Sequence, residues 1–207
     1  GADTVARPGQ APLRWGRSYV LPTEEFEQIR RIDQLLGTWD SMREVSKVET
    51  WELPDENHIK FGSPMEGWLP IERGEKAEVR TFVNEEEQKA LLKSIRDARK
   101  RSDVVIAALH THEGCTENWY SPIPPKFVEE YAHAAIDAGA DVFVGHGAHF
   151  ARGMEIYQGH PIFYNLGSLL MEFEAGESII APEMYESYGY APDSRPSDLH
   201  GNRAKDK

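Results

Sequence analysis

Cysteine is nearly absent from the sequence. Cys115 stands alone among 207 residues, so no disulfide can form within the chain. Long apolar runs are missing too, and no segment approaches the roughly 18 consecutive apolar residues of a membrane-spanning helix. Basic residues are in the minority, 23 against 35 acidic ones, and a net charge of −12 argues against a nucleic-acid backbone as the main partner. We therefore expect neither a membrane span in this chain nor a nucleic-acid partner.

The composition is that of a folded protein with an ordinary core. Apolar residues make up 40% of the chain and charged residues 28%, as in typical globular proteins. A length of 207 residues suits one domain, so we predict a single domain over residues 1–207. The segment from about residue 182 to 207 is polar and rich in proline, and we expect it to be a peripheral loop or tail.

The first half of the chain predicts two helices among short strands. RSYVL (17–21) has the pattern of a strand, and Thr23 is the expected N-cap of a helix whose apolar residues recur at helical spacing until Gly37. HIKFG (58–62) and AEVRTFV (77–83) are expected to be extended. Asn84 is the expected N-cap of a second helix, with acidic residues in its first turn and basic residues in its last.

The second half predicts a strand, a helix and a second strand in succession. DVVIAALH (103–110) and DVFVGH (141–146) are short apolar runs of the kind found in buried strands, and the helical pattern 125–140 lies between them. Such a unit places the two strands parallel and adjacent. MEIYQGHPIFYNLG (154–167) is expected to be a hairpin that turns at Gln158 and Gly159. The fold class that follows is α/β.

Histidine pairs stand at the ends of both strands of this unit. His110 and His112 end the first strand, and His146 and His149 end the second. Ligands of open α/β sheets collect at the carboxyl ends of the strands, so we expect these imidazoles to lie within reach of one another. A single histidine at a strand end is more often structural, but two pairs at equivalent ends favour metal ligation. With Glu113 nearby, the donors suit Zn, Mn or Fe better than Mg or Ca.

The stretches DVVIAALHTHEG, AAIDAGADVFVGHGAHFARGMEIY and HPIFYNLGSLL resemble the CapA family of poly-γ-glutamate capsule synthesis, which is related to the calcineurin-like metallophosphoesterases. The resemblance implies an αββα sandwich of mixed sheets with one or two divalent transition-metal ions at the strand ends. It also implies that this chain is the interior or C-terminal part of such a domain, incomplete at its N-terminal side. The Gly-Asp and Asn-His motifs that complete the family's two-metal site are missing here. We therefore expect a missing N-terminal half or a second chain to complete the site.

The resemblance also assigns roles to individual residues. It makes His110, His146 and His149 metal ligands, and it makes His112 and Glu113 catalytic groups. A further set, expected to contact the substrate, is Arg152, Asn165 and Ser168. Ser168 stands where many relatives have asparagine, so a role that needs the asparagine amide is not expected to be kept.

Three functions follow as alternatives. The first is a metal-dependent enzyme that hydrolyses a peptide-like (γ-glutamyl) or phosphoester substrate with metal-activated water. The second is a metal-dependent epimerase that removes the Cα proton from the C-terminal residue of a ribosomal peptide. The third is a non-catalytic scaffold for the assembly of an acidic polymer. A cytoplasmic location is expected, with an extracellular, membrane-associated one as in capsule-type relatives as the alternative.

Overall fold

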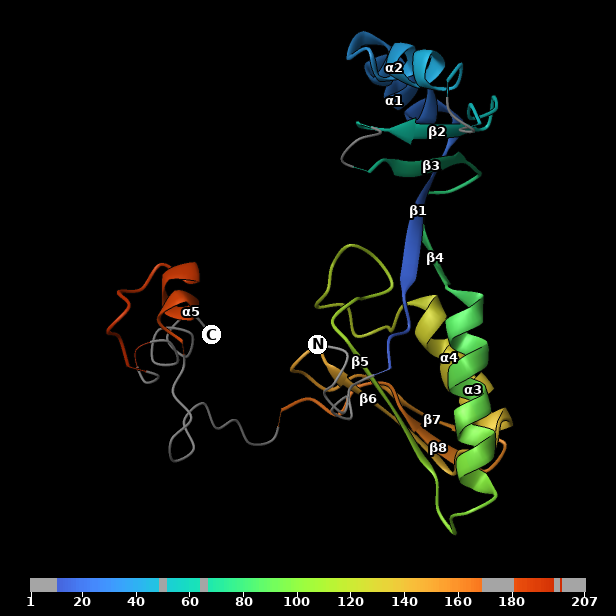
Figure 1. Ribbon diagram of the computed structural model, residues 1–207, viewed down its shortest axis with the longest axis vertical. Coiled ribbons are helices and arrows are strands. Elements are labelled where there is room, and N and C mark those ends of the chain that lie inside the picture. The colour runs from blue at the N-terminus through green and yellow to red at the C-terminus, as the bar shows by residue number, and fades with distance from the viewer. Residues whose placement is uncertain (1–10, 49–51, 64–66, 169–180, 196–197, 199–207) are drawn as a thin grey trace, which may run out of the picture. The chain divides into compact units, whose positions relative to one another are not determined.

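The computed structural model describes residues 11–48, 52–63, 67–168, 181–195 and 198 (Figure 1). The chain divides into two compact units, Gly1–Gly167 and Ser168–Lys207. The described residues of the first unit form two four-stranded sheets, and each sheet mixes parallel with antiparallel pairs. The expected fold class, α/β with mixed sheets, is confirmed.

Strand β1 (Trp15–Leu21) lies inside the first sheet, here called the β1 sheet, between β3 and β4. It runs parallel to β3 and antiparallel to β4, while β2 pairs with the far side of β3. The bounds of these strands are β2 (His58–Phe61), β3 (Leu69–Arg73) and β4 (Glu78–Val83).

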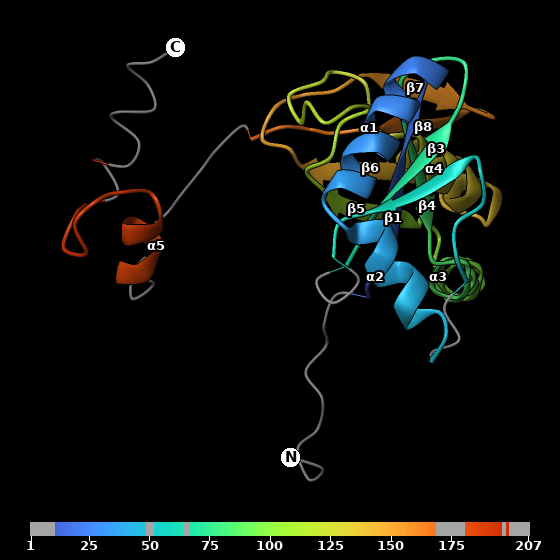
Figure 2. The ribbon, with the colours of Figure 1, turned by 90° about the horizontal axis from the view of Figure 1, so that it is seen from above.

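Two helices lie between β1 and β2 in the chain, α1 (Thr23–Leu35) and α2 (Thr38–Val45). Helix α1 lies across the sheet (Figure 2) and buries Phe26 completely against Ile59 and Ile71. The expectation that Thr23 caps α1 is wrong by one residue, because Pro22 holds the N-cap position with φ −58° and ψ 159°. The fixed ring of proline sets this extended geometry, so the helix begins at Thr23 without a side-chain cap.

The second sheet, here called the β5 sheet, is the predicted strand–helix–strand unit extended by a hairpin. Its strand order is β5-β6-β8-β7, with β5, β6 and β8 parallel and β7 antiparallel at one edge. The strands are β5 (Ile106–Thr111), β6 (Val142–Gly147), β7 (Met154–Tyr157) and β8 (His160–Phe163). The turn of the hairpin has φ 51° at Gln158 and φ 84° at Gly159, which is the type I′ geometry that such two-residue turns favour.

Helices α3 (Glu85–Arg99) and α4 (Lys126–Asp137) cover one face of the β5 sheet. Helix α3 begins as predicted, because the Asn84 side chain accepts a hydrogen bond of 3.0 Å from the Glu87 backbone N–H. Helix α4 buries Val128, Ala132 and Ala135 completely against Phe143 and Ile162. The main core of the first unit therefore lies between α4 and the β5 sheet, and burial of its apolar surface is the main stabilising contribution.

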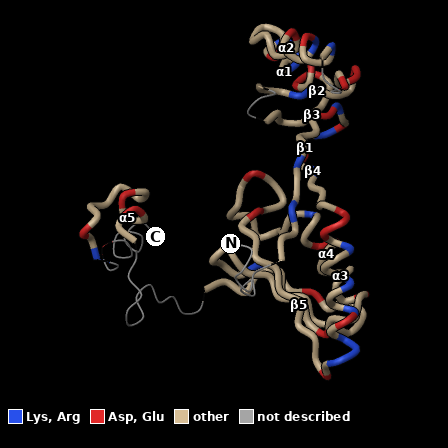
Figure 3. The backbone as a smooth tube through the Cα atoms, viewed as in Figure 1, with Lys and Arg blue, Asp and Glu red and all other residues tan. Residues whose placement is uncertain are grey.

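The opposite face of the β5 sheet is apolar, yet no described element of the first unit packs over it in the way α4 packs over the core face. The register puts Ala108 beside Val144 and Val144 beside Phe163 on this face. Ile106, Met154 and Ile156 on the same face are each more than 60% exposed. Strand β5 carries no charged residue and is tan in Figure 3, whereas α3 carries many charges of both signs.

The second unit contains helix α5 (Pro182–Ser187), which begins with Pro182 and buries Tyr185. A loop or tail was expected from about residue 182, so the sequence missed this helix. Its six residues are too few to show a helical period, and the buried Tyr185 supplies the stabilisation that the sequence pattern did not reveal. Among the described residues, no helix is long and apolar enough to cross a membrane.

Glu155 joins the hairpin to α4, and it should make stability depend on pH. Its carboxylate accepts a 2.6 Å hydrogen bond from the Tyr164 hydroxyl and pairs with His133 at 3.0 Å. The Tyr164 hydrogen bond and then His133 lower the pKa of Glu155, so its contribution is present at neutral pH and is lost as the pH falls through the folded-state value. Replacing Glu155 with Gln should cost about 0.5–1 kcal/mol at pH 7, and the loss should shrink between about pH 5 and pH 3.

Thermal unfolding of the wild type and the E155Q variant across this pH range measures the effect. A Glu25→Gln variant, which removes an exposed acid from α1, is the control and should leave the pH dependence unchanged. Equal melting curves for wild type and E155Q at pH 7 would contradict the assignment.

Candidate active site

The parallel pairing of β5 with β6 puts His110 directly opposite His146. The two Nδ1 atoms are 2.8 Å apart, and the ring centroids are separated by 4.8 Å. The other ring nitrogen of His110, Nε2, lies 3.2 Å from Nε2 of His112. His112 in turn meets His149 edge to face, with ring centroids 5.6 Å apart. The four predicted histidines therefore form one continuous group, in the order His146, His110, His112, His149.

Two glycines let the strand end approach its neighbours closely enough to form this group. A Cβ atom at Gly145 would lie 2.1 Å from the Tyr164 carbonyl oxygen, and one at Gly147 would lie 2.6 Å from the Thr111 carbonyl oxygen. Gly147 also has φ 120°, a conformation that residues with a side chain rarely adopt. Two residues later, His149 has φ 60°, so the turn that carries it is left-handed at a non-glycine residue.

Glu113 is oriented by its own loop. Its Oε2 atom accepts a 3.0 Å hydrogen bond from the His112 backbone N–H and a second one from the Thr111 hydroxyl. The carboxylate therefore fixes the strand end from which His112 projects. Both predicted catalytic groups, His112 and Glu113, are half-buried and line one cavity.

Burial affects the charge state of His146. His146 is half-buried, and desolvation, followed by the neighbouring charge of His110, holds the pKa of its imidazole below the ordinary value. Neutral imidazole keeps a nitrogen lone pair available, which is the state that binds a metal or accepts a proton.

The three predicted substrate-contacting residues lie in different surroundings. The Asn165 side chain is buried and bonds the turn that carries His149, accepting from the Ala148 N–H at 3.4 Å and donating to the Phe150 carbonyl. This contact supports a part in shaping the turn. Ser168 is the first residue of the second unit and is described with that unit. The substrate contacts of both residues stay predictions.

Arg152 is a buried cation whose guanidinium is only partly hydrogen-bonded. Its side chain donates to the Trp119 carbonyl at 3.1 Å and lies over the Phe150 ring, whereas its Nε and Nη1 atoms have no hydrogen-bond partner. Burial lowers the pKa of its guanidinium, while the charges of Glu113 and Cys115 oppose that shift. Arg152 thus contacts the loop that carries Glu113 and Trp119, and it adds positive charge near the Glu113 carboxylate.

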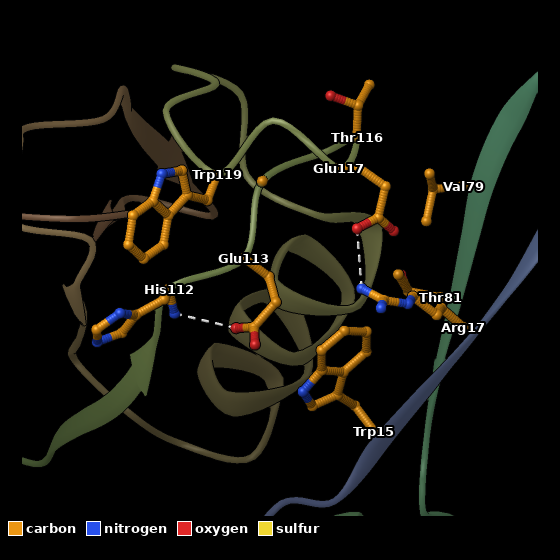
Figure 4. Close-up of a pocket in the computed structure, with 10 residues that line it drawn as sticks. Trp15, Arg17, Val79, Thr81, His112, Glu113, Thr116, Glu117 and Trp119 are labelled. Atoms are coloured by element: carbon orange, nitrogen blue, oxygen red, sulfur yellow. Dashed lines mark hydrogen bonds and ion pairs between the residues drawn. The ribbon is translucent and has the colours of Figure 1, made fainter. Parts of the chain in front are cut away.

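A cavity of about 130 Å³ adjoins His112 and Glu113 (Figure 4). Figure 4 shows Glu113 between the indole rings of Trp15 and Trp119, with Arg17 reaching from β1 toward Glu117. The Arg17 guanidinium lies 3.0 Å from the Glu117 carboxylate. Sequence reasoning missed Trp15, Arg17, Glu117 and Trp119 as site residues. No local signal marks Arg17, because the contact joins two positions 100 residues apart in the chain.

The imidazole nitrogens of the histidine group are donors of the type that transition metals prefer. Among the described residues, the number of donors that meet at one point is, however, too small for a complete site. Two nitrogens bound to one tetrahedral Zn²⁺ are roughly 3.3 Å apart, and the nitrogen contacts of His110 are near this value. In the described part of the chain, however, no group of three or more His, Cys, Asp or Glu side chains is arranged to hold an ion. These residues therefore offer pairs of ligands rather than a complete site, and the ligand set His110, His146 and His149 stays a prediction.

Comparison with known proteins identifies relatives of the chain. The family model described as "Bacterial capsule synthesis protein PGA_cap" matches residues 41–172. An uncharacterized protein of Sinorhizobium fredii, y4sH, is 30% identical over 92% of this chain and 37% of its own length. The chain therefore spans little more than a third of that relative.

Two relatives with named roles match a shorter stretch. The PGA biosynthesis protein CapA of Bacillus subtilis is 35% identical over 38% of this chain and 19% of its own length. The capsule biosynthesis protein CapA of Bacillus anthracis is 34% identical over 40% of this chain and 20% of its own length. These matches bear out the resemblance seen in the strand-end sequences.

The close approach at Gly147 gives a direct test of the histidine arrangement. A Gly147→Ala variant should lower the free energy of unfolding by about 2–4 kcal/mol, because the methyl group meets the Thr111 carbonyl and the backbone is left-handed there. It should also shift the imidazole NMR signals of His110 and His146, since the ends of β5 and β6 must separate. A Gly153→Ala variant is the matched control, because nothing lies within 4 Å of its added carbon. Similar stability and similar spectra for the two variants would contradict this account.

Proposed function

Since the chain belongs to the bacterial capsule synthesis protein PGA_cap family, we propose that it forms part of a metal-dependent enzyme that hydrolyses a peptide-like (γ-glutamyl) or phosphoester substrate. The observation that carries the proposal is the continuous group of four imidazoles at the ends of two parallel strands. A purely structural role requires no such gathering of four titratable rings at one edge of a sheet.

His110 and His146 are the proposed ligand pair, because their nitrogens lie closest together and one strand register fixes both. A divalent transition metal such as Zn, Mn or Fe would supply an activated water and polarise the bond to be cleaved. His112, next in the group, is the proposed general acid or base. Glu113 holds the strand end beneath His112, and Arg152 adds positive charge behind Glu113.

The remaining ligands are proposed to come from a further layer of polypeptide, either a region outside these 207 residues or a second chain. The support is the apolar face of the β5 sheet, which bears Ile106, Val144 and Met154 and ends at His110 and His146. Exposed apolar surface of this kind marks a surface that another element covers. A layer packed there would exclude water and bring its own side chains to the histidine end of the strands.

The cavity beside His112 is the proposed position of the substrate. Its indoles offer flat apolar walls, and Arg17 offers a cation that can meet a carboxylate or phosphate if it exchanges its Glu117 partner. This chemistry accommodates an acidic peptide such as a γ-glutamyl chain. The relatives from Bacillus carry capsule or PGA biosynthesis in their names, which is consistent with such a substrate.

Titration of the purified chain with ZnCl₂ tests the ligand pair. We expect wild-type chain to bind Zn²⁺ and a His110→Ala/His146→Ala double variant to bind it at least about tenfold more weakly, since each lost imidazole removes a direct ligand. His133→Gln is the control, because this histidine pairs with Glu155 outside the group. Calorimetry gives the affinities, and circular dichroism verifies that each variant is folded. Equal affinity of wild type and double variant would overturn the metal assignment and favour a scaffold role.

The reaction is tested with a γ-glutamyl oligopeptide in D₂O. The oligopeptide is incubated with the metal-loaded chain together with the polypeptide region or second chain that completes its site. Hydrolysis shortens the oligopeptide without placing deuterium at Cα, and a His112→Gln variant should reduce the rate by about 10²–10⁴-fold. Mass spectrometry follows both chain length and deuterium content. Deuterium at Cα with unchanged chain length would instead establish epimerisation and overturn the hydrolase proposal.

A further inference from the structure

A second cavity, of about 220 Å³, lies away from the histidine group, between α1, α2 and the segment that leads into β2. It is larger than the cavity beside His112 and is lined by apolar and charged side chains together. The lining residues that matter for its chemistry are Arg30, Asp33, Trp39, Met42, His58 and Lys60.

Asp33, on α1, is the unusual member of this lining. The residue is 4% exposed, and its Oδ1 atom is buried with no hydrogen-bond partner. The Thr38 side chain bonds the same carboxyl group, and burial raises its pKa despite that bond. A buried carboxylate oxygen without a donor is costly, so a native structure normally supplies one.

The cations around the cavity already have other partners. Arg30 donates to the Glu56 carbonyl and lies over the Phe26 ring, 4.8 Å from its centroid. Lys60 donates to the Glu52 carbonyl at 2.8 Å and lies over Trp68. His58 pairs with Asp55 at 2.6 Å.

None of these contacts reaches Asp33, although Arg30 stands three residues before it on the same helix. Asp33 lines this cavity, and in the described part of the chain its Oδ1 atom has no donor among the surrounding side chains.

We propose that this cavity is a binding site for a small primary amine, whose ammonium group donates to Asp33 and whose apolar body packs against Trp39 and Met42. A charged donor satisfies a carboxylate more strongly than a neutral donor does. The Trp39 indole offers both apolar surface and an electron-rich ring face that favours a cation. The proposal is independent of the histidine group and of the reaction proposed for it.

Benzylammonium and benzyl alcohol form a matched pair of probes, since they share shape and apolar body and differ in the charged donor. We expect the 207-residue chain to bind benzylammonium in a calorimetric titration, and to bind benzyl alcohol at least about tenfold more weakly. In ¹H–¹⁵N NMR spectra, benzylammonium should shift the signals of α1, α2 and residues 54–60. Equal affinity for the two probes, no binding of benzylammonium, or shifts confined to the loop 112–119 would each overturn the proposal.

The Asp33→Asn variant keeps the shape of the side chain and removes its charge. We expect it to weaken benzylammonium binding at least about tenfold and to leave benzyl alcohol binding unchanged. Asp40→Asn is the control, because Asp40 is an exposed acid on α2 that pairs with Arg43 outside the cavity lining. Unchanged benzylammonium binding in D33N would overturn the proposal. The comparison of the two probes on wild-type chain decides the question even if D33N does not fold.

Discussion

The register between β5 and β6 is the constraint on which the candidate site depends. Side chains of a strand alternate between faces, so a slip of one residue would move His110 or His146 to the helix-covered side. The pairing is held by a buried core on one face, where Ala107 lies beside Phe143, and by the glycines that permit close contact at the strand ends. Core packing and imidazole placement are thus two consequences of one register.

The two faces of the β5 sheet differ in what covers them. One face is covered by α3 and α4, and the other is apolar, exposed and terminated by histidines. Nitrogens of the described histidines meet in pairs rather than in threes. The uncovered apolar face and the paired imidazoles meet at one end of the sheet, and both support the further layer proposed above. The chain spans little more than a third of its Sinorhizobium relative.

The elements that carry strong local patterns could be predicted from the sequence. The helix capped by Asn84, the hairpin at Gln158 and Gly159, and the parallel strands that end in His110 and His146 were all expected, and the structure confirms them. Where local signals were weak, prediction failed. Pro22 displaced Thr23 as the cap, and the six-residue helix α5 has too few residues to show a period. The predicted ligand and substrate roles of individual residues await experiment.

The sequence by itself determined that four histidines stand at equivalent ends of adjacent strands, because parallel strands joined by a helix place their carboxyl ends at one edge. It also determined the family, since the strand-end motifs are local in the chain. Only the tertiary structure decided which nitrogens meet, that Trp15 and Arg17 border the same cavity as Glu113, and that Asp33 is buried without a donor for Oδ1. These facts depend on contacts between residues far apart in the chain, and on the exclusion of water by packing, neither of which has a local sequence signature.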